Sequence, residues 1–375
     1  MKVKTALLPL LLVPLFFSTR ASADENPVIF NGLTYPIKAK LPAAQKEGSV
    51  LFETPFSEHA AASYDTVLLQ GEMPDPGASV ELLVKSGSFL APPARYRSEK
   101  FRRFPSGRFW ARYRVPLTRQ PLKLSVVNLG VKSFSFLTIY ETEMFQAAAD
   151  REEPLPQEAA PYVPDPELFL PATAPFKVIR RAAWQALPPT APYTPHQPRY
   201  FTLHHTQAHY PKTYDEAVAE MLFIQDFHQN GRGWIDIAYH FLIDPAGNIF
   251  EGRPIKVLGS HVKNRNTANI GISIMGNFHP PASNVFTAVS QDSFVAIGTY
   301  LKDTYEVPVS SFYAHRDIGN SDCPGDDLYA KKELLRGSIF AAPPQGLPAN
   351  PENAPPPTPA QQRSLRQLTQ YLNEP

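Results

Sequence analysis

Prolines gather in two stretches of this 375-residue sequence, and they separate segments that can pack into a core from segments that cannot. Seven of the 41 prolines lie in residues 147–175, and a second cluster lies in residues 341–375. Proline interrupts helix interiors and central strands, so it accumulates in linkers, tails and turns. We predict a stiff, extended linker in the first stretch, a largely disordered tail in the second, and folded domains over residues 24–146 and 176–340.

The first 23 residues have the pattern of a secretory signal peptide. Lys2 and Lys4 precede an apolar run that ends at Phe17, and Ala21-Ser22-Ala23 supplies the small residues that a signal peptidase recognises. The run is too short and too interrupted by proline to span a bilayer comfortably, and no later stretch is apolar for long enough. We expect a protein without a membrane span that is exported to the periplasm or secreted to the cell wall.

Charge and cysteine content exclude several classes of protein. The 36 Lys and Arg residues nearly balance 35 Asp and Glu residues, which argues against a protein built to bind nucleic acid. Cys323 is the single cysteine, so a disulfide within the chain is impossible. A lone thiol in an exported protein is a liability unless it is buried and inert or has a function. We expect a monomer.

Residues 24–146 are predicted to form a small all-β domain, an antiparallel sandwich or barrel. Its segments alternate in polarity and are separated by turns rich in Pro, Gly and Asp: 64–69, 79–84, 109–115, 122–128 and 133–143. Basic residues cluster between Arg95 and Arg108. Such a cluster is either a solvated loop or a surface for an anionic polymer, and in the second case the domain would target the protein to the wall.

Residues 176–340 alternate strands and helices, which predicts an α/β domain with one mixed sheet flanked by about three helices. The expected strands cover residues 200–203, 238–243, 248–251 and 270–274. Thr213 and Glu216 form a capping box at the start of the first helix, and Gly231 is expected to end it. The other two helices are expected over residues 287–305 and 327–339.

Two histidines and the only thiol form a candidate metal site. His204 ends a predicted strand, and His315 and Cys323 lie on one loop that follows another short apolar segment. Two imidazoles and a thiolate are a plausible set of three zinc ligands that leaves a fourth position for water. Spacing alone does not single out these residues, because His205, His209 and His261 are rival ligands.

Seven segments of this domain stand in the order and spacing of a known family: Leu203–Thr206, Trp234–Ile243, Phe250–Arg253, Gly259–His261, Asn269–Phe278, His315–Asp317 and Cys323–Gly325. On these residues the domain resembles the peptidoglycan recognition protein and type-2 N-acetylmuramoyl-L-alanine amidase family. The resemblance covers residues 176–340 and does not extend to the β domain, the linker or the tail.

The resemblance implies that His204, His315 and Cys323 bind one Zn²⁺ and that Tyr239 is a catalytic residue. It implies hydrolysis of the amide between N-acetylmuramic acid and the L-alanine of the peptidoglycan stem, by a water that zinc activates. The phenol of Tyr239 has an ordinary pKa near 10, so we expect this residue to orient water and pass protons rather than act as a free base.

Two positions depart from the family's pattern. Ser321 stands where relatives usually carry threonine or lysine to steady the oxyanion, and its hydroxyl can still donate one hydrogen bond. Pro254-Ile255 replaces a segment associated with the third stem residue, so the preference for diaminopimelate or lysine does not follow. As substrate contacts or supports for the ligands we predict the following residues: His205, Thr206, Arg253, His261 and Asn264.

Two other functions compete with a zinc amidase. One is a peptidoglycan-binding module that has kept the groove and lost the chemistry, which the departure at Ser321 favours. The other is a zinc peptidase that acts on peptide cross-links. The retained Cys323 favours an enzyme, because family members that only bind peptidoglycan commonly lack this ligand.

Overall fold

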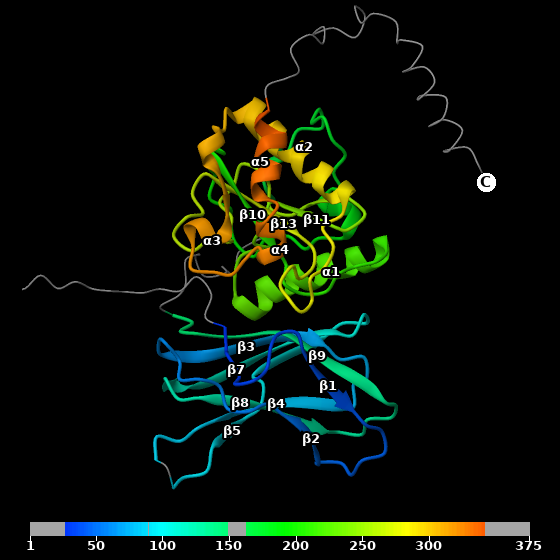
Figure 1. Ribbon diagram of the computed structural model, residues 1–375, viewed down its shortest axis with the longest axis vertical. Coiled ribbons are helices and arrows are strands. Elements are labelled where there is room, and N and C mark those ends of the chain that lie inside the picture. The colour runs from blue at the N-terminus through cyan, green and yellow to red at the C-terminus, as the bar shows by residue number, and fades with distance from the viewer. Residues whose placement is uncertain (1–26, 89, 149–162, 342–375) are drawn as a thin grey trace, which may run out of the picture.

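The computed structural model describes residues 27–88, 90–148 and 163–341. The predicted signal peptide, half of the predicted linker and nearly all of the predicted tail lie outside the described residues. Two bodies stack along the long axis of the molecule, one built of strands and the other of strands and helices (Figure 1). Within the described residues, no helix combines the length and the apolarity that a bilayer crossing requires.

The strands of the first body form two antiparallel sheets, ordered β1-β9-β3-β7-β6 and β2-β8-β4-β5. The prediction of an all-β sandwich is therefore confirmed, and each predicted strand lies within or overlaps an observed one. The strands are β1 (Ile37–Leu41), β2 (Val50–Glu53), β3 (Tyr64–Glu72), β4 (Ala78–Val84), β5 (Ala94–Tyr96), β6 (Lys100–Arg103), β7 (Arg108–Thr118), β8 (Leu122–Asn128) and β9 (Ser135–Phe145).

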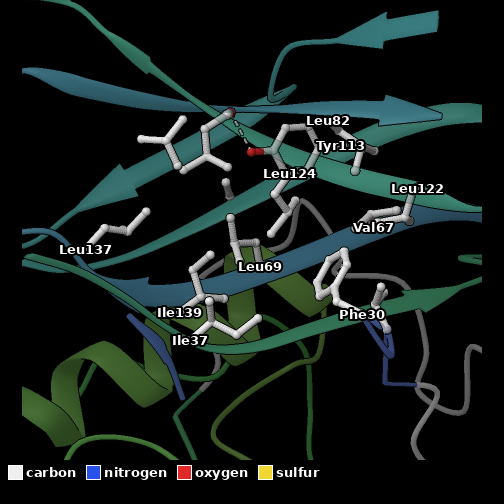
Figure 2. Close-up of a cluster of buried hydrophobic side chains, with 14 of the residues drawn as sticks. Phe30, Ile37, Val67, Leu69, Leu82, Tyr113, Leu122, Leu124, Leu137 and Ile139 are labelled. Atoms are coloured by element: carbon white, nitrogen blue, oxygen red, sulfur yellow. Dashed lines mark hydrogen bonds between the residues drawn. The ribbon is translucent and has the colours of Figure 1, made fainter. Parts of the chain in front are cut away.

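Alternate residues of both sheets fill the space between them. Figure 2 shows Leu69 and Ile139 of one sheet facing Leu82 and Leu124 of the other. The hydroxyl of Tyr113 crosses the core and donates to the Val80 carbonyl at 2.7 Å, which satisfies the one polar group of this ring. Successive side chains of a strand point to opposite faces, so the first sheet has a second face that is free to meet another body.

The second body is one mixed sheet in the order β12-β11-β13-β10-β14 with helices on both faces, as predicted. Helices α2 and α5 pack on one face and α1 on the other. Its elements are η1 (Pro166–Leu168), η2 (Arg181–Trp184), β10 (Tyr200–His205), α1 (Tyr214–Asp226), η3 (Phe227–Arg232), β11 (Phe241–Ile243), β12 (Ile249–Glu251), β13 (Asn269–Ile274), α2 (Ala288–Tyr305), η4 (Val309–Ser311), β14 (Phe312–Ala314), α3 (His315–Ile318), α4 (Asp326–Tyr329) and α5 (Lys332–Phe340).

The helical segment made of α1 and η3 begins where predicted but ends later. The Thr213 hydroxyl accepts from the Glu216 amide at 3.2 Å, as an N-cap does. Gly231 does not stop the helix, because the chain continues into the π-helical turn η3. The end is at Gly233, whose left-handed φ of 81° glycine adopts without a Cβ penalty. The predicted helix 327–339 is likewise two shorter helices, α4 and α5.

The outer face of the first sheet packs on α1 and η3, so the two bodies share a core. Leu68 and Trp110 of the sandwich belong to the same buried cluster as Met221 and Phe227. Beside this cluster the Arg108 guanidinium forms a bidentate salt bridge with the Glu220 carboxylate, with N–O distances of 2.9 and 3.0 Å.

The basic cluster of the sandwich therefore needs a correction. Arg108 is 2% exposed and Arg102 pairs with Asp226 at 2.6 Å, so both lie in this interface. Arg95 pairs with Glu81 of the neighbouring strand. The interpretation of this segment as solvated is wrong for Arg108, whereas the side chains of Arg95 and Arg102 are about half exposed (50% and 54%) although each meets a carboxylate.

The last part of the predicted linker packs on the α/β domain. Leu170 is 3% exposed and joins the core beneath α2 and α5. Its carbonyl accepts from Arg180, which also binds Glu251 of β12 at 2.8 Å. Residues 163–175 therefore form part of the domain surface.

Candidate metal centre

The topology of the sheet brings the three predicted ligands to one edge. β10 lies parallel to β14, with Leu203 beside Ala314, so the carboxyl ends of the two strands meet. His204 is the second-to-last residue of strand β10, and His315 directly follows β14 at the start of α3. The loop between α3 and α4 then returns Cys323 to the same place. Crevices at the carboxyl edge of such sheets are common ligand sites.

The donor atoms of His204, His315 and Cys323 all lie within 4.8 Å of one another. Each of the three side chains is at most 5% exposed. The Sγ atom of Cys323 lies 3.5 Å from Nδ1 of His204. Of the rival histidines His205, His209 and His261, none shares this cluster within the described residues.

The donor set fits a zinc ion. Ligand bonds of about 2.3 Å to sulfur and about 2.0 Å to nitrogen at a tetrahedral angle place the two donors roughly 3.5 Å apart. The sulfur also accepts from the backbone amide of His205 at 3.4 Å, which favours a thiolate. Burial, and then the neighbouring His315 and His261, hold the pKa of His204 well below its usual value, so this imidazole is neutral, the form that binds metal.

His261 supports His204 from behind. Nδ1 of His261 lies 3.0 Å from Nε2 of His204, and Nε2 of His261 lies 3.2 Å from the Asn269 carbonyl. Since Nδ1 of His204 faces the sulfur, Nε2 carries the proton and donates to His261. The prediction of His261 as a support for the ligands agrees with this geometry. Burial lowers the pKa of His261 to about 3, so this ring is neutral as well.

Two glycines make room for the supporting ring. A Cβ atom at Gly271 of β13 would lie 2.6 Å from the His261 ring, and one at Gly259 would meet the same ring at 2.6 Å. Real Cβ atoms do not approach other atoms so closely. The segments Gly259–His261 and Asn269–Phe278 therefore build one pocket for an imidazole.

Tyr239 lies beside the candidate ligands and is partly exposed. The centroid of its ring is 5.3 Å from that of His204. The Tyr239 carbonyl accepts from the Arg253 amide at 2.9 Å, and a Cβ atom at Gly252 would lie 2.2 Å from this carbonyl oxygen. Gly252 thus permits the close backbone contact that holds Tyr239 at the centre.

Arg253 supports the site and does not line it. It is 1% exposed, and its guanidinium donates to the carbonyls of Ile237, Leu258 and Asp236. The geometry does not favour the predicted substrate contact by this side chain, because its N–H groups already donate to carbonyls inside the protein. The buried guanidinium instead joins the segment before Tyr239 to the segment before His261.

The remaining predicted groove residues are placed differently from one another. His205 is 2% exposed, and as the next residue of β10 it points to the opposite face from His204. The Thr206 hydroxyl accepts from the Gly276 amide at 2.9 Å, which fixes a turn. Asn264 is exposed and has the left-handed φ of 60° that asparagine tolerates.

Ser321 orders the loop that carries the sulfur. Its Oγ accepts from the Cys323 amide at 2.9 Å. Two side chains that sequence analysis missed hold the same loop, because His279 (at 3.0 Å) and Arg316 both donate to the Asp322 carbonyl. His279 lies one residue beyond the matching segment Asn269–Phe278, which was the one signal that pointed to it.

A buried charge network behind Tyr239 was also missed. Asp236 is fully buried and pairs with Arg181 at 2.9 Å, while Gln225 donates to it at 2.7 Å and Tyr193 donates through its hydroxyl. Asp236 belongs to the segment Trp234–Ile243, so its place in the motif was the available signal. The network holds the backbone around Asp236, three residues before Tyr239.

Comparisons with known proteins agree on the second domain. The family profile described as N-acetylmuramoyl-L-alanine amidase matches residues 194–326. Peptidoglycan-recognition protein SC2 of Drosophila melanogaster is 35% identical over 133 residues, which cover 35% of this chain and 70% of that protein. Peptidoglycan recognition protein 1 of Mus musculus is 34% identical over 164 residues, which cover 42% and 87%.

Among solved structures, N-acetylmuramoyl-L-alanine amidase LysC from Clostridium intestinale is 27% identical. The match covers 42% of this chain and 97% of that one, with a TM-score of 0.35.

An α/β domain with a His-His-Cys cluster at the carboxyl edge of its sheet defines the class of protein. The chain belongs to the family of peptidoglycan recognition proteins and type-2 N-acetylmuramoyl-L-alanine amidases.

Proposed function

We propose that this protein is a zinc-dependent N-acetylmuramoyl-L-alanine amidase that hydrolyses peptidoglycan between N-acetylmuramic acid and L-alanine. The observation that carries the proposal is the convergence of His204, His315 and Cys323 within 4.8 Å in a buried site. Three protein ligands with an open fourth position are typical of catalytic rather than structural zinc.

His204, His315 and Cys323 would hold the ion. When bound, zinc supplies a Lewis acid that activates water at neutral pH and polarises the scissile carbonyl. The chain's own part is to keep His204 neutral and in one tautomer, and the bond from His204 to His261 fixes that tautomer. The Ser321 hydroxyl, whose oxygen already accepts from the loop, can still donate one hydrogen bond to a developing oxyanion.

Tyr239 is the residue that we propose for proton transfer. Its phenol hydroxyl can both accept and donate a hydrogen bond. Its position beside His204 suits a group that orients the attacking water and returns a proton to the leaving amine.

The proposed partner is peptidoglycan. Both its sugar and its stem peptide would bind in the site. We propose that the protein acts as a monomer after export through its signal-like first 23 residues. The wall or the periplasm is where this substrate occurs.

Replacement of the sulfur tests the proposal. Cys323→Ser removes the thiolate and should abolish both stoichiometric zinc and the release of stem peptides from muropeptides. Ser321→Ala is the matched control on the same loop, and it should keep the zinc and lose only part of the rate. Release at the wild-type rate by Cys323→Ser would overturn the proposal.

A binding module is the competing function, and the names of the recognition proteins that this chain resembles favour it. Equilibrium binding of muropeptides to the zinc-loaded wild type without any product over hours would support that alternative. A zinc peptidase would instead cut between amino acids and leave the lactyl amide intact.

A further inference from the structure

We infer that the β domain positions the catalytic tyrosine, through an ion pair between Glu143 of β9 and Arg232 of η3. The inference rests on the proposed function, since it assigns a role in the same site. The expectation that this domain targets the protein to the wall stays a separate prediction.

Three strands of the sandwich hold the π-helical turn η3 and the residue before it. The Trp110 indole donates to Asp226 at 2.7 Å, and Arg102 donates to the same carboxylate at 2.6 Å. Arg112 donates to the Gly231 carbonyl at 3.2 Å. A Cβ atom at Gly231 would lie 3.4 Å from Leu68, so glycine lets the turn lie close to the sheet.

Glu143 and Arg232 form the interdomain ion pair at the end of this turn. Their side chains are 6% and 19% exposed, and Nη2 of Arg232 bonds to Oε1 of Glu143. Arg232 lies at the end of the turn, immediately before Gly233, where the chain leaves for Tyr239. A largely buried cation that loses its bonded carboxylate is driven toward water, because a poorly paired charge is costly in the interior.

A series of tilted and edge-on ring contacts connects Arg232 to Tyr239. The guanidinium lies over the Trp234 ring at 4.8 Å, and the Trp234 ring lies 5.0 Å from His228. The His228 ring lies 6.0 Å from Tyr239, which in turn is 5.3 Å from His204. Nδ1 of His228 accepts from the Ala238 amide at 3.1 Å, so the backbone just before Tyr239 is bonded to the same series of rings.

This arrangement makes Arg232 and Glu143 positioning residues rather than catalytic ones. Neither belongs to the metal cluster, and they act through the place of Tyr239. π-Helical turns are unusual and are found at functional sites, where their extra residue aims a side chain. A displacement of a reacting group by about 1 Å costs on the order of 100-fold in rate. A small shift of the rings that hold Tyr239 would therefore change the rate measurably.

The test compares two carboxylates that each pair with one cation. Glu143→Gln should lower kcat about 10-fold on a defined muropeptide, with KM changed less than about twofold and zinc content unchanged. Glu53→Gln is the matched control, because Glu53 pairs with Lys123 on the sheet that faces away from the α/β domain. It should leave both constants unchanged, and an equal loss in both variants would overturn the inference.

A double-mutant cycle separates positioning from general destabilisation. In a Tyr239→Phe background the Glu143→Gln change should cost less than about twofold, because the group that it positions has gone. The full loss in that background would overturn the inference.

A second readout does not depend on activity. In the free protein, amide hydrogen exchange over residues 228–239 should accelerate in Glu143→Gln and not in Glu53→Gln. Accelerated exchange in a protein that cleaves no muropeptide would mean that the proposed function fails while the positioning role holds. Unchanged exchange in Glu143→Gln would overturn the positioning role itself.

Discussion

The ring of His261 lies directly behind that of His204, with Nδ1 of His261 3.0 Å from Nε2 of His204, on the far side of His204 from the sulfur of Cys323. This contact fixes which nitrogen of His204 keeps its proton and which is free to bind a metal. It also fixes the orientation of the ring, and the Asn269 carbonyl continues the chain of bonds.

Removal of the supporting ring should weaken the metal site without removing a ligand. We expect His261→Ala to lower zinc affinity by about 10- to 100-fold, the usual cost of losing the partner of a metal-bound histidine. Competition with a chromophoric chelator measures this affinity. His261→Gln keeps an acceptor and should recover part of it. Equal affinity in His261→Ala and wild type would contradict the role of this ring.

A methyl group placed behind the same ring should have a similar effect. Gly271→Ala puts a Cβ atom 2.6 Å from His261, and the strand cannot move aside, so the ring must shift. We expect lower zinc affinity together with a loss of stability. Gly337→Ala is the control in helix α5, where nothing lies within 4 Å, and it should stabilise the protein by up to about 1 kcal/mol. Normal zinc binding by Gly271→Ala would show that the pocket tolerates the added atom.

The buried pair between the two domains should dominate their association. Arg108→Met leaves the carboxylate of Glu220 buried and unpaired, and we expect the free energy of unfolding to fall by about 3–5 kcal/mol. Urea denaturation measures it. Lys123→Met breaks the more exposed pair with Glu53 and should cost less than about 1 kcal/mol. The double variant Arg108→Met, Glu220→Leu should recover most of the loss, and a cost as small as that of Lys123→Met would contradict a buried, coupled pair.

The contact between His209 and Glu72 should make the interface sensitive to pH. His209, on the loop between β10 and α1, lies 3.5 Å from Glu72 of β3 and 3.7 Å from Glu216. Burial by itself lowers the pKa of His209, but the bond to Glu72 and the charge of Glu220 outweigh burial and the repulsion of Arg108. The pKa of His209 is therefore raised above its usual value, while the pKa of Glu72 is lowered, chiefly by its bond to His209.

The direction of the effect follows from these two shifts. A raised histidine pKa adds stability that is complete below about pH 6.5 and is lost as pH rises through the folded value. The lowered pKa of Glu72 adds stability above about pH 4.5 that is lost only under more acid conditions. We expect His209→Gln to destabilise the protein at pH 5.5, on the order of 1 kcal/mol, and much less at pH 8.5. An equal loss at both pH values in thermal unfolding would contradict this.

The general fold was accessible from sequence because it depends on local pattern, whereas the candidate ligands followed from the family resemblance, since spacing alone left His205, His209 and His261 as rivals. Alternating polarity predicted the sandwich strands, and the motif around Cys323 predicted the cluster that the topology of β10 and β14 then assembles. The N-cap at Thr213 is equally local. These features depend on residues close together in sequence or on motifs with fixed spacing.

The interface between the domains could not be predicted in this way. Arg108 and Glu220 are 112 residues apart, and neither has a local pattern that marks it as buried. A charged residue is normally solvated, so the basic cluster was interpreted as surface. The continuation of the helical segment past Gly231 into η3 could not be predicted for the same reason. The turn packs on Leu68 and Trp110 of the other domain, which are distant in sequence.

Mass spectrometry of a defined muropeptide digest tests the central claim most directly. With zinc present, the wild type should convert a muropeptide into an intact muramyl sugar and a stem peptide with a free L-alanine amine, and a chelator should stop the conversion. Unchanged muropeptide in the presence of zinc-loaded, folded protein would contradict the claim, as would cleavage at any other bond.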